Sequence, residues 1–149
     1  WRFTIFSHDN RAVLGKKLQS IYSKLTPKDS YRQDKFEKLG QNPSLAPLVI
    51  AICMKRGANP KIPEIEEIEA VACAVQNMHL TAAAAGLGAF WSSPPILDSE
   101  EMREFLNLDP QDHCLGLFYL GWLKKGQDWP KSSRSPIADK IVWFNNENK

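Results

Sequence analysis

The stretch GLGAFWSSPP, residues 86–95, holds the side chains best suited to chemistry. Two glycines one residue apart are typical of phosphate-binding loops, and the dinucleotide fingerprint adds a third glycine in a strand-to-helix turn. Here Trp91 occupies the third position, and the pair follows an expected helix and precedes an expected strand. The pattern therefore excludes a dinucleotide loop. It predicts that Gly86 ends the helix in the left-handed conformation and that Gly88 turns the chain into the strand.

The residues after the glycines leave two interpretations open. Phe90 and Trp91 stand beside Ser92 and Ser93, where a short strand meets a loop. Hydroxyls and backbone amides there could face a flat heteroaromatic ligand, with one aromatic ring flanking it. Equally, Trp91 could be a core residue and the serines turn residues. The pattern alone favours neither.

Other polar residues indicate no catalytic set. Gln76, Asn77 and His79 fall on an expected buried helix, where core or interface hydrogen bonds are the expected role. Lys131 and Arg134 could bind a phosphate or remain solvated in the tail. There is no Ser-His-Asp order, Cys-His pairing or close carboxylate pair, so no catalytic side chain is predicted.

The cysteines and histidines indicate neither disulfides nor a metal site. Cys53, Cys73 and Cys114 each lie in an apolar run, which predicts reduced, buried thiols and a cytoplasmic protein. The three histidines lie far apart without metal-ligand spacing, so no metal is expected.

Length and charge limit the possible partners. The 149 residues are enough for one core, and 43% are hydrophobic and 24% charged. The net charge of +2 is spread along the chain, so we expect no nucleic-acid partner. No apolar span is long enough for a bilayer, so we expect no membrane association. The chain begins at Trp1 on a strand-like run, and we expect further residues of the protein before it.

Hydrophobic periodicity predicts an α+β fold in which helices cover a sheet. We expect strands over residues 2–6, 47–54, 89–93, 113–122 and 141–144. Helices are expected from an Asp9 cap to residue 25, over residues 63–84, and from an Asp98 or Ser99 cap through residue 106. Residues 26–46 read as a connector with a short helix around Phe36. The 63–84 helix is apolar almost all round, which favours cover by its own sheet and by a second subunit.

Four segments in this order resemble the flavin-dependent nitroreductases. They are WRFTIF, IPEIEEIEAVACAVQNMHLTAAAAGLGAFWSS, HCLGLFYLGW and RSPIADKIVWF. The resemblance is closest to small members that lack a large lid, and it implies one domain over residues 1–149. It further implies a central mixed β-sheet covered by helices in an intertwined homodimer with FMN at the interface. NADH or NADPH would reduce the flavin, and a nitroaromatic, quinone or related small-molecule electron acceptor would reoxidise it in a ping-pong cycle.

The resemblance also implies roles for particular residues. Trp91, Ser92 and Ser93 would line the isoalloxazine, and Arg134 would meet the flavin phosphate. A nicotinamide-binding segment would comprise Thr81, Ala82, Ala83, Ala84, Ala85 and Gly86. The family's N-terminal Arg-Arg-Ser motif, and its Asn or His loop before the first strand, do not occur in these residues. A non-catalytic flavin-binding or interaction protein on the same fold is therefore the alternative.

Overall fold

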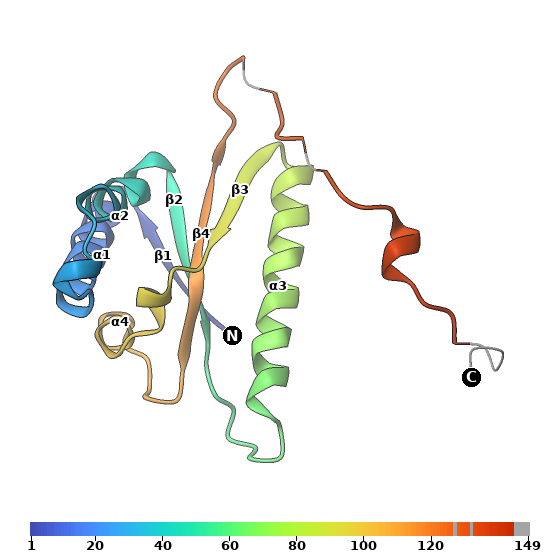
Figure 1. Cartoon of the computed structure of the whole chain (residues 1–149), viewed down its shortest axis with the longest axis horizontal. Helices are drawn as coiled ribbons and strands as arrows, with labels where there is room; N and C mark the ends of the chain where they lie inside the picture. The colour runs from blue at the N-terminus through green and yellow to red at the C-terminus, as the bar shows by residue number, and fades with distance from the viewer. Residues whose placement is uncertain (127, 132, 145–149) are drawn as a thin grey trace.

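The computed structural model describes residues 1–126, 128–131 and 133–144. Four helices and four strands occupy most of this chain (Figure 1). In chain order they are β1 (Arg2–Ser7), α1 (Asn10–Leu25), α2 (Gln33–Leu45), β2 (Leu48–Met54), α3 (Glu64–Ala84), β3 (Leu87–Ser92), α4 (Glu100–Leu106) and β4 (His113–Trp122). Short 3₁₀ turns, η1 (Lys28–Ser30), η2 (Pro95–Asp98) and η3 (Ile137–Lys140), lie between or after them.

The four strands form a sheet in the order β1-β2-β4-β3, and every neighbouring pair is antiparallel. The α+β class and the helix cover are confirmed. The expectation of a mixed sheet is wrong for the described residues, because none of the three strand pairs is parallel. The order leaves β1 and β3 as the two edges, so the strand that carries Trp91 and Ser92 lies at the border of the sheet.

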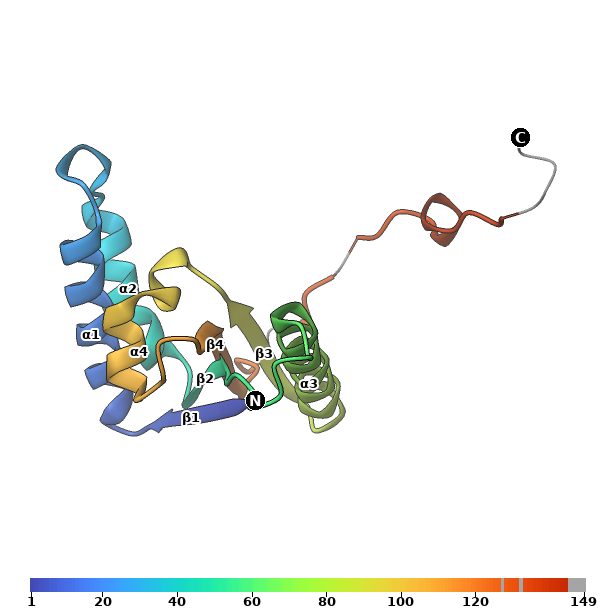
Figure 2. The same cartoon turned by 90° about the horizontal axis from the view of Figure 1, so that it is seen from below.

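The molecule has three layers, with α1, α2 and α4 on one face of the sheet and α3 on the other (Figure 2). Alternate residues of a strand point to opposite faces, so β2 contributes to two cores. Val49, Ala51 and Cys53 pack with α1 and α4, whereas Ile50 and Ile52 pack with α3. This alternation explains why β2 reads as one continuous apolar run.

Helix α2 corrects the expectation of a connector over residues 26–46. Its composition is unfavourable, since Gly40 and Pro43 both lie inside it. Packing on α1 compensates, because a Cβ on Gly15 would overlap the backbone of Gly40. The amide of Gln19 donates to the carbonyl of Phe36 at 3.1 Å and joins the same two helices. Tertiary contact therefore outweighs local propensity here.

Helix α3 buries one face and leaves the other uncovered in this chain. Val71, Val75 and Ala82 are buried against the sheet, in agreement with the predicted periodicity. Cys73 and Leu80 lie on the other face, and both are exposed. The expectation that all three cysteines are buried is therefore wrong for Cys73, because its side of the helix has nothing packed on it. Cover of that side by a second subunit remains a prediction.

The polar residues of α3 also differ from expectation. Gln76 and Asn77 are exposed, so neither needs a buried partner in this chain. The ring of His79 instead meets Phe118 edge-on, with ring centroids 4.7 Å apart. No helix in the described part of the chain is long and apolar enough to cross a bilayer.

Of the predictions for the two glycines around the start of β3, one is confirmed and the other is wrong. Gly86 has φ +72° and follows the last turn of α3, which confirms it as the left-handed residue that ends the helix. The prediction that Gly88 turns the chain is wrong, because Gly88 lies inside β3 and pairs with Gly121 of β4. Gly86 already completes the turn, so the strand begins at Leu87.

The segment after β4 leaves the sheet as an extended tail (Figure 1). Residues 141–144, expected as a last strand, pair with no strand of the described chain. A strand needs a hydrogen-bonding neighbour, and the tail runs away from both sheet edges. Trp143 and Phe144 are 81% and 97% exposed. This end of the chain is therefore an apolar segment without cover.

Candidate functional site

The end of β3 is the first part of the candidate site, because it carries Trp91, Ser92 and Ser93. Trp91 faces the α3 side of the sheet and packs on the cluster that contains Ile52 and Phe118. Ser92 faces the α2 side, since neighbouring residues of a strand point to opposite faces. The two residues are adjacent in sequence but do not line a common hollow.

Trp91 lies directly against Gly116, at a bend in β4 where the pairing of this strand with β2 shifts by one residue. A Cβ on Gly116 would overlap the indole nitrogen of Trp91 and would lie 2.7 Å from the carbonyl oxygen of Ser92. Among the described residues, the buried Nε1 of Trp91 has no hydrogen-bond acceptor. Buried donors rarely lack a partner, so this N–H is a polar group that the chain itself does not satisfy. The core interpretation of Trp91 is therefore supported, because the indole packs on the core cluster and its N–H is enclosed at Gly116.

Ser92 lines a hollow of about 300 Å³ between β3 and the end of α2. Its other lining residues are Asn42, Leu45, Ala46, Phe90 and Tyr119. Phe90 is 63% exposed, and burial raises the pKa of the Tyr119 phenol above its ordinary value. Two aromatic rings with a hydroxyl and an amide form a surface suited to a flat ligand with a polar edge.

Ser93 is tied to the neighbouring strand. Its hydroxyl donates to the carbonyl oxygen of Leu115 at 2.8 Å, which fixes the start of the loop that leads to η2. His113, two residues before Leu115, contacts Asp98 through Nδ1 and Glu64 through Nε2, at 2.9 and 2.8 Å. These contacts join β4 to η2 and to the first residue of α3.

A buried carboxylate organises the loop before β4. Asp112 is fully buried and accepts hydrogen bonds from the backbone N–H groups of Arg56 and Asp109 at 2.9 and 3.0 Å. Lys55 pairs with Asp109 at 2.7 Å, and this hydrogen bond lowers the pKa of the Asp109 carboxyl and raises that of Lys55. Asp112 was not among the residues expected to be functional, although an Asp among turn residues just before a buried strand is a recognisable signal in the sequence.

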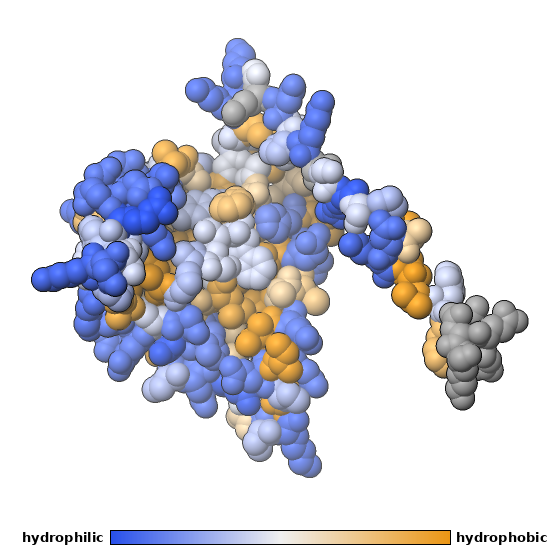
Figure 3. Space-filling model, viewed as in Figure 1, coloured by the Kyte–Doolittle hydropathy of each residue, from blue (hydrophilic) through white to orange (hydrophobic). Residues whose placement is uncertain are grey.

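The predicted nicotinamide segment lies at the opposite end of β3. Thr81, Ala82 and Ala85 line a second hollow of about 550 Å³ between α3 and β1. Its other lining residues are Trp1, Phe3, Ala74, Asn77, Met78, Leu87, Phe118 and Leu120. Ala83, Ala84 and Gly86 are exposed outside it. Figure 3 shows apolar side chains gathered where α3 borders the sheet.

The expected site residues therefore do not meet within one chain. The six-residue strand β3 separates Ser92 from the segment that ends at Gly86, a span of roughly 17 Å. Arg134 is exposed in the tail, which departs from the sheet (Figure 1). Trp1 and Phe3 were not expected to line a hollow, since their contact with α3 depends on the tertiary fold.

A sequence model of the nitroreductase family matches residues 1–122. The chain belongs to the nitroreductase family. It is 35% identical over 85 residues to a protein of Escherichia coli (strain K12) named "Putative NAD(P)H nitroreductase YdjA". That alignment covers 57% of this chain and 46% of YdjA, so the match spans less than half of the relative's length.

Solved structures confirm the nitroreductase fold. The nitroreductase-like family protein from Bacillus cereus has a TM-score of 0.75 at 20% identity, over 98% of this chain and 74% of the other. A nitroreductase with bound FMN from Bacteroides fragilis has a TM-score of 0.69 at 19% identity, over 97% and 76% of the two chains. The family match over residues 1–122 confirms the resemblance, and the structure shows where the chain places the residues expected at a flavin.

Within this family context, the chain's groups can be compared with what FMN requires. Ser92 and Ser93 offer hydroxyls and backbone amides for the polar edge of a flavin, whereas the unsatisfied N–H of Trp91 is buried against Gly116 on the other face of β3. Arg134 offers a cation of the kind that binds phosphate. Among the described residues, no three His, Cys, Asp or Glu side chains lie close enough to hold a metal ion. The residue types fit FMN, although Arg134 stands apart from the others in this chain.

Proposed function

We propose that this protein is a homodimeric, FMN-dependent NAD(P)H oxidoreductase that reduces nitroaromatic, quinone or related small acceptors by ping-pong hydride transfer. The observation that carries the proposal is the family match over residues 1–122. The FMN bound to the Bacteroides fragilis nitroreductase and the NAD(P)H in the name of YdjA support the choice of cofactor and reductant. We further propose that residues 1–149 form a single domain and that the protein works in the cytoplasm.

In this proposal the chain binds and orients, and it supplies no catalytic side chain. FMN, when bound, provides the hydride chemistry. Ser92 and Ser93 would hold the isoalloxazine, with Trp91 packed behind them on the other face of β3, and Arg134 would hold the phosphate. The segment from Thr81 to Gly86 would receive the nicotinamide. The apolar lining that includes Ala82 and Ala85 would exclude water from that end of the site.

The separation of these residues supports the homodimer. One chain places the Thr81 end and the Ser92 end at opposite ends of β3. A second copy, packed on the uncovered side of α3, can bring one end from each chain to a shared site. The exposed Leu80 on that side supports the same arrangement.

The test is a flavin titration of the purified protein. We expect added FMN to shift its absorption spectrum on binding, and NADH or NADPH to bleach the bound flavin without oxygen. An acceptor such as a quinone should then restore the oxidised spectrum. Protein that leaves the FMN spectrum unchanged would contradict the proposal. Protein that binds FMN but shows no turnover with any nitro or quinone acceptor would support the non-catalytic alternative.

The phosphate contact has a matched pair of variants. Arg134→Gln should weaken FMN binding about ten-fold or more, because charge-assisted hydrogen bonds contribute roughly 1.5–3 kcal/mol. Lys125→Gln removes another exposed cation near the tail and should leave FMN affinity unchanged. Equal affinities for the two variants would remove Arg134 from the proposed site.

A further inference from the structure

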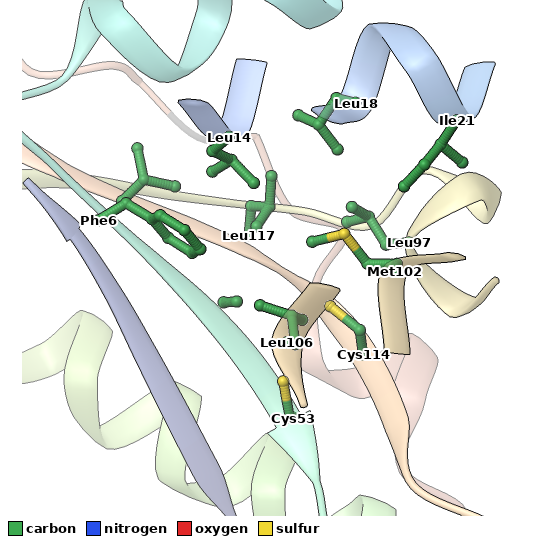
Figure 4. Close-up of a cluster of buried hydrophobic side chains, with 12 residues drawn as sticks. Phe6, Leu14, Leu18, Ile21, Cys53, Leu97, Met102, Leu106, Cys114 and Leu117 are labelled. Atoms are coloured by element: carbon green, nitrogen blue, oxygen red, sulfur yellow. The ribbon is translucent and has the colours of Figure 1, made fainter. Parts of the chain in front are cut away.

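Two buried cysteines face each other across neighbouring strands. Cys53 of β2 and Cys114 of β4 are direct partners in the antiparallel register. Opposed residues of such a pair have Cα atoms about 4.5–5.5 Å apart, within the roughly 4.4–6.8 Å that a disulfide spans. Both side chains point into the same core cluster, beside Met102 and Leu106 (Figure 4). The backbone therefore already has the geometry that a cross-strand disulfide requires.

The bend in β4 creates this pairing. The register shifts between Ile52 and Cys53, so that Ile52 pairs with Gly116 and Cys53 with Cys114. Leu115 is the extra residue, and its side chain packs with the cluster on the α3 face. The shift brings Cys114 and Leu117 to the same face of the sheet, although they are three residues apart. Without it, strict alternation would place Cys114 and Leu117 on opposite faces.

The two thiols are not equivalent. Cys114 is the less completely buried of the two, 3% exposed against 0% for Cys53, and their interaction lowers the pKa of Cys114 and raises that of Cys53. Cys114 is therefore the attacking thiol of the pair. The burial of Cys53 raises its pKa further. Cys73, by contrast, is exposed on α3 and lies outside this cluster.

Helix α4 is a short element that covers the pair. It has only seven residues, and its Met102 and Leu106 pack in the cluster with both cysteines. Its N-terminus depends on one side-chain cap, with the Met102 N–H donating to Ser99 Oγ at 3.3 Å. Its first turn is tied to α1 by the ion pair of Lys24 with Glu101 at 2.6 Å. Short elements with few such ties open locally at low free-energy cost.

We propose that Cys53 and Cys114 form a redox-active dithiol that a small hydroperoxide oxidises to a cross-strand disulfide when α4 opens. The Cys114 thiolate attacks the terminal peroxide oxygen, the O–O bond breaks, and an alcohol (water, for hydrogen peroxide) leaves as Cys114 becomes a sulfenic acid. The Cys53 sulfur then attacks the Cys114 sulfur and expels water. In sum, two thiols lose two electrons and two protons, and one hydroperoxide becomes an alcohol and a water. This chemistry needs no flavin and stands apart from the proposed function.

The test uses the folded protein in a Cys73→Ser background, which removes the exposed thiol. Hydrogen peroxide is added, the reaction is quenched, and the protein is unfolded and treated with N-ethylmaleimide. We expect Cys53 and Cys114 to lose their reactivity together, with an intact mass lower by two hydrogens. Dithiothreitol should restore both thiols. Two fully alkylated thiols, after a peroxide exposure that oxidises Cys73 of the unmodified protein, would overturn the proposal.

Single variants test the order of the two steps. In Cys53→Ser, which keeps a hydrogen-bonding side chain beside Cys114, the reaction should stop at a sulfenic acid on Cys114, which dimedone traps as an adduct. Cys114→Ala should leave Cys53 unreacted under the same conditions. Cys53→Ala and Cys114→Ser provide a second pair, should either of the first two variants unfold. In Cys53→Ala the adduct should form more slowly, because the interaction that lowers the pKa of Cys114 is lost. A dimedone adduct on Cys53 and none on Cys114 would overturn the assignment of the attacking thiol.

Discussion

At the scale of single residues, the contact between Gly116 and Trp91 connects the bend in β4 to the candidate site. The indole of Trp91 covers the position that a Cβ of Gly116 would take, and the carbonyl of Ser92 lies beside it. Gly116 has φ +152°, which also favours glycine. Gly116 thus permits β3 to approach β4 closely, which determines the position of Ser92. It also permits the register in which Cys53 pairs with Cys114.

Gly116→Ala should therefore destabilise the protein. Overpacking of this kind costs about 1–3 kcal/mol in the free energy of unfolding. Gly88→Ala is the matched control in β3, because a Cβ there would meet its nearest atom at 3.7 Å, an ordinary contact. Urea denaturation followed by tryptophan fluorescence measures both variants. If Gly116→Ala is as stable as Gly88→Ala, the close packing of Trp91 on β4 is not a constraint.

At the scale of elements, the Ser99 cap determines how firmly α4 covers the core. The Ser99 hydroxyl accepts from the Met102 N–H and donates to the Ile96 carbonyl at 2.8 Å. Ser99→Ala should lower the free energy of unfolding by about 1 kcal/mol. If α4 opening controls access to Cys114, native-state alkylation of that thiol should become about five-fold faster. Ser20→Ala, at an exposed position of α1, should change neither quantity.

The ion pair between α4 and α1 gives a dependence on pH. The hydrogen bond from Lys24 lowers the pKa of Glu101 below its ordinary value of 4.5. A carboxyl whose pKa is lower in the folded state stabilises the fold above its ordinary pKa, and this contribution is lost as the pH falls through the folded value. Melting temperatures of wild type and Glu101→Gln should therefore differ near neutral pH and converge in acid below 4.5. A difference in melting temperature that stays constant across this pH range would contradict the stabilising role of the Lys24–Glu101 ion pair.

Sequence patterns predicted the elements whose signals are local. The apolar run of β4, the Ser99 cap and the glycine after α3 are each encoded within a few neighbouring residues, and all were found. Helix α2 was missed because the contact of Gly40 with Gly15 joins residues distant in sequence. Strand alternation places Trp91 and Ser92 on opposite faces, but no local pattern predicts that Trp1 and Phe3 share a hollow with α3.

At the scale of the whole molecule, two of the apolar surfaces that remain uncovered among the described residues bear on assembly. One is the outer side of α3 with the adjoining hollow, and the other is the tail that carries Trp143 and Phe144. Figure 3 shows apolar side chains at both places. Uncovered apolar patches of this kind indicate contact surfaces. In the proposed function, the separation of Thr81 from Ser92 within one chain favours a site shared with a second copy.

A charged residue on the outer side of α3 should therefore separate the subunits without unfolding them. Leu80 is 60% exposed in the single chain, so Leu80→Glu should leave the monomer fold intact while a buried, unpaired carboxylate opposes dimer formation. Val13→Glu is the control, because Val13 is 51% exposed on α1, on the other face of the sheet. Sedimentation velocity should show a dimer for wild type and Val13→Glu, and a monomer with native circular dichroism for Leu80→Glu. Since the proposed flavin site needs both copies, FMN affinity should fall in parallel with the dimer fraction. A Leu80→Glu protein that stays dimeric would place the interface elsewhere.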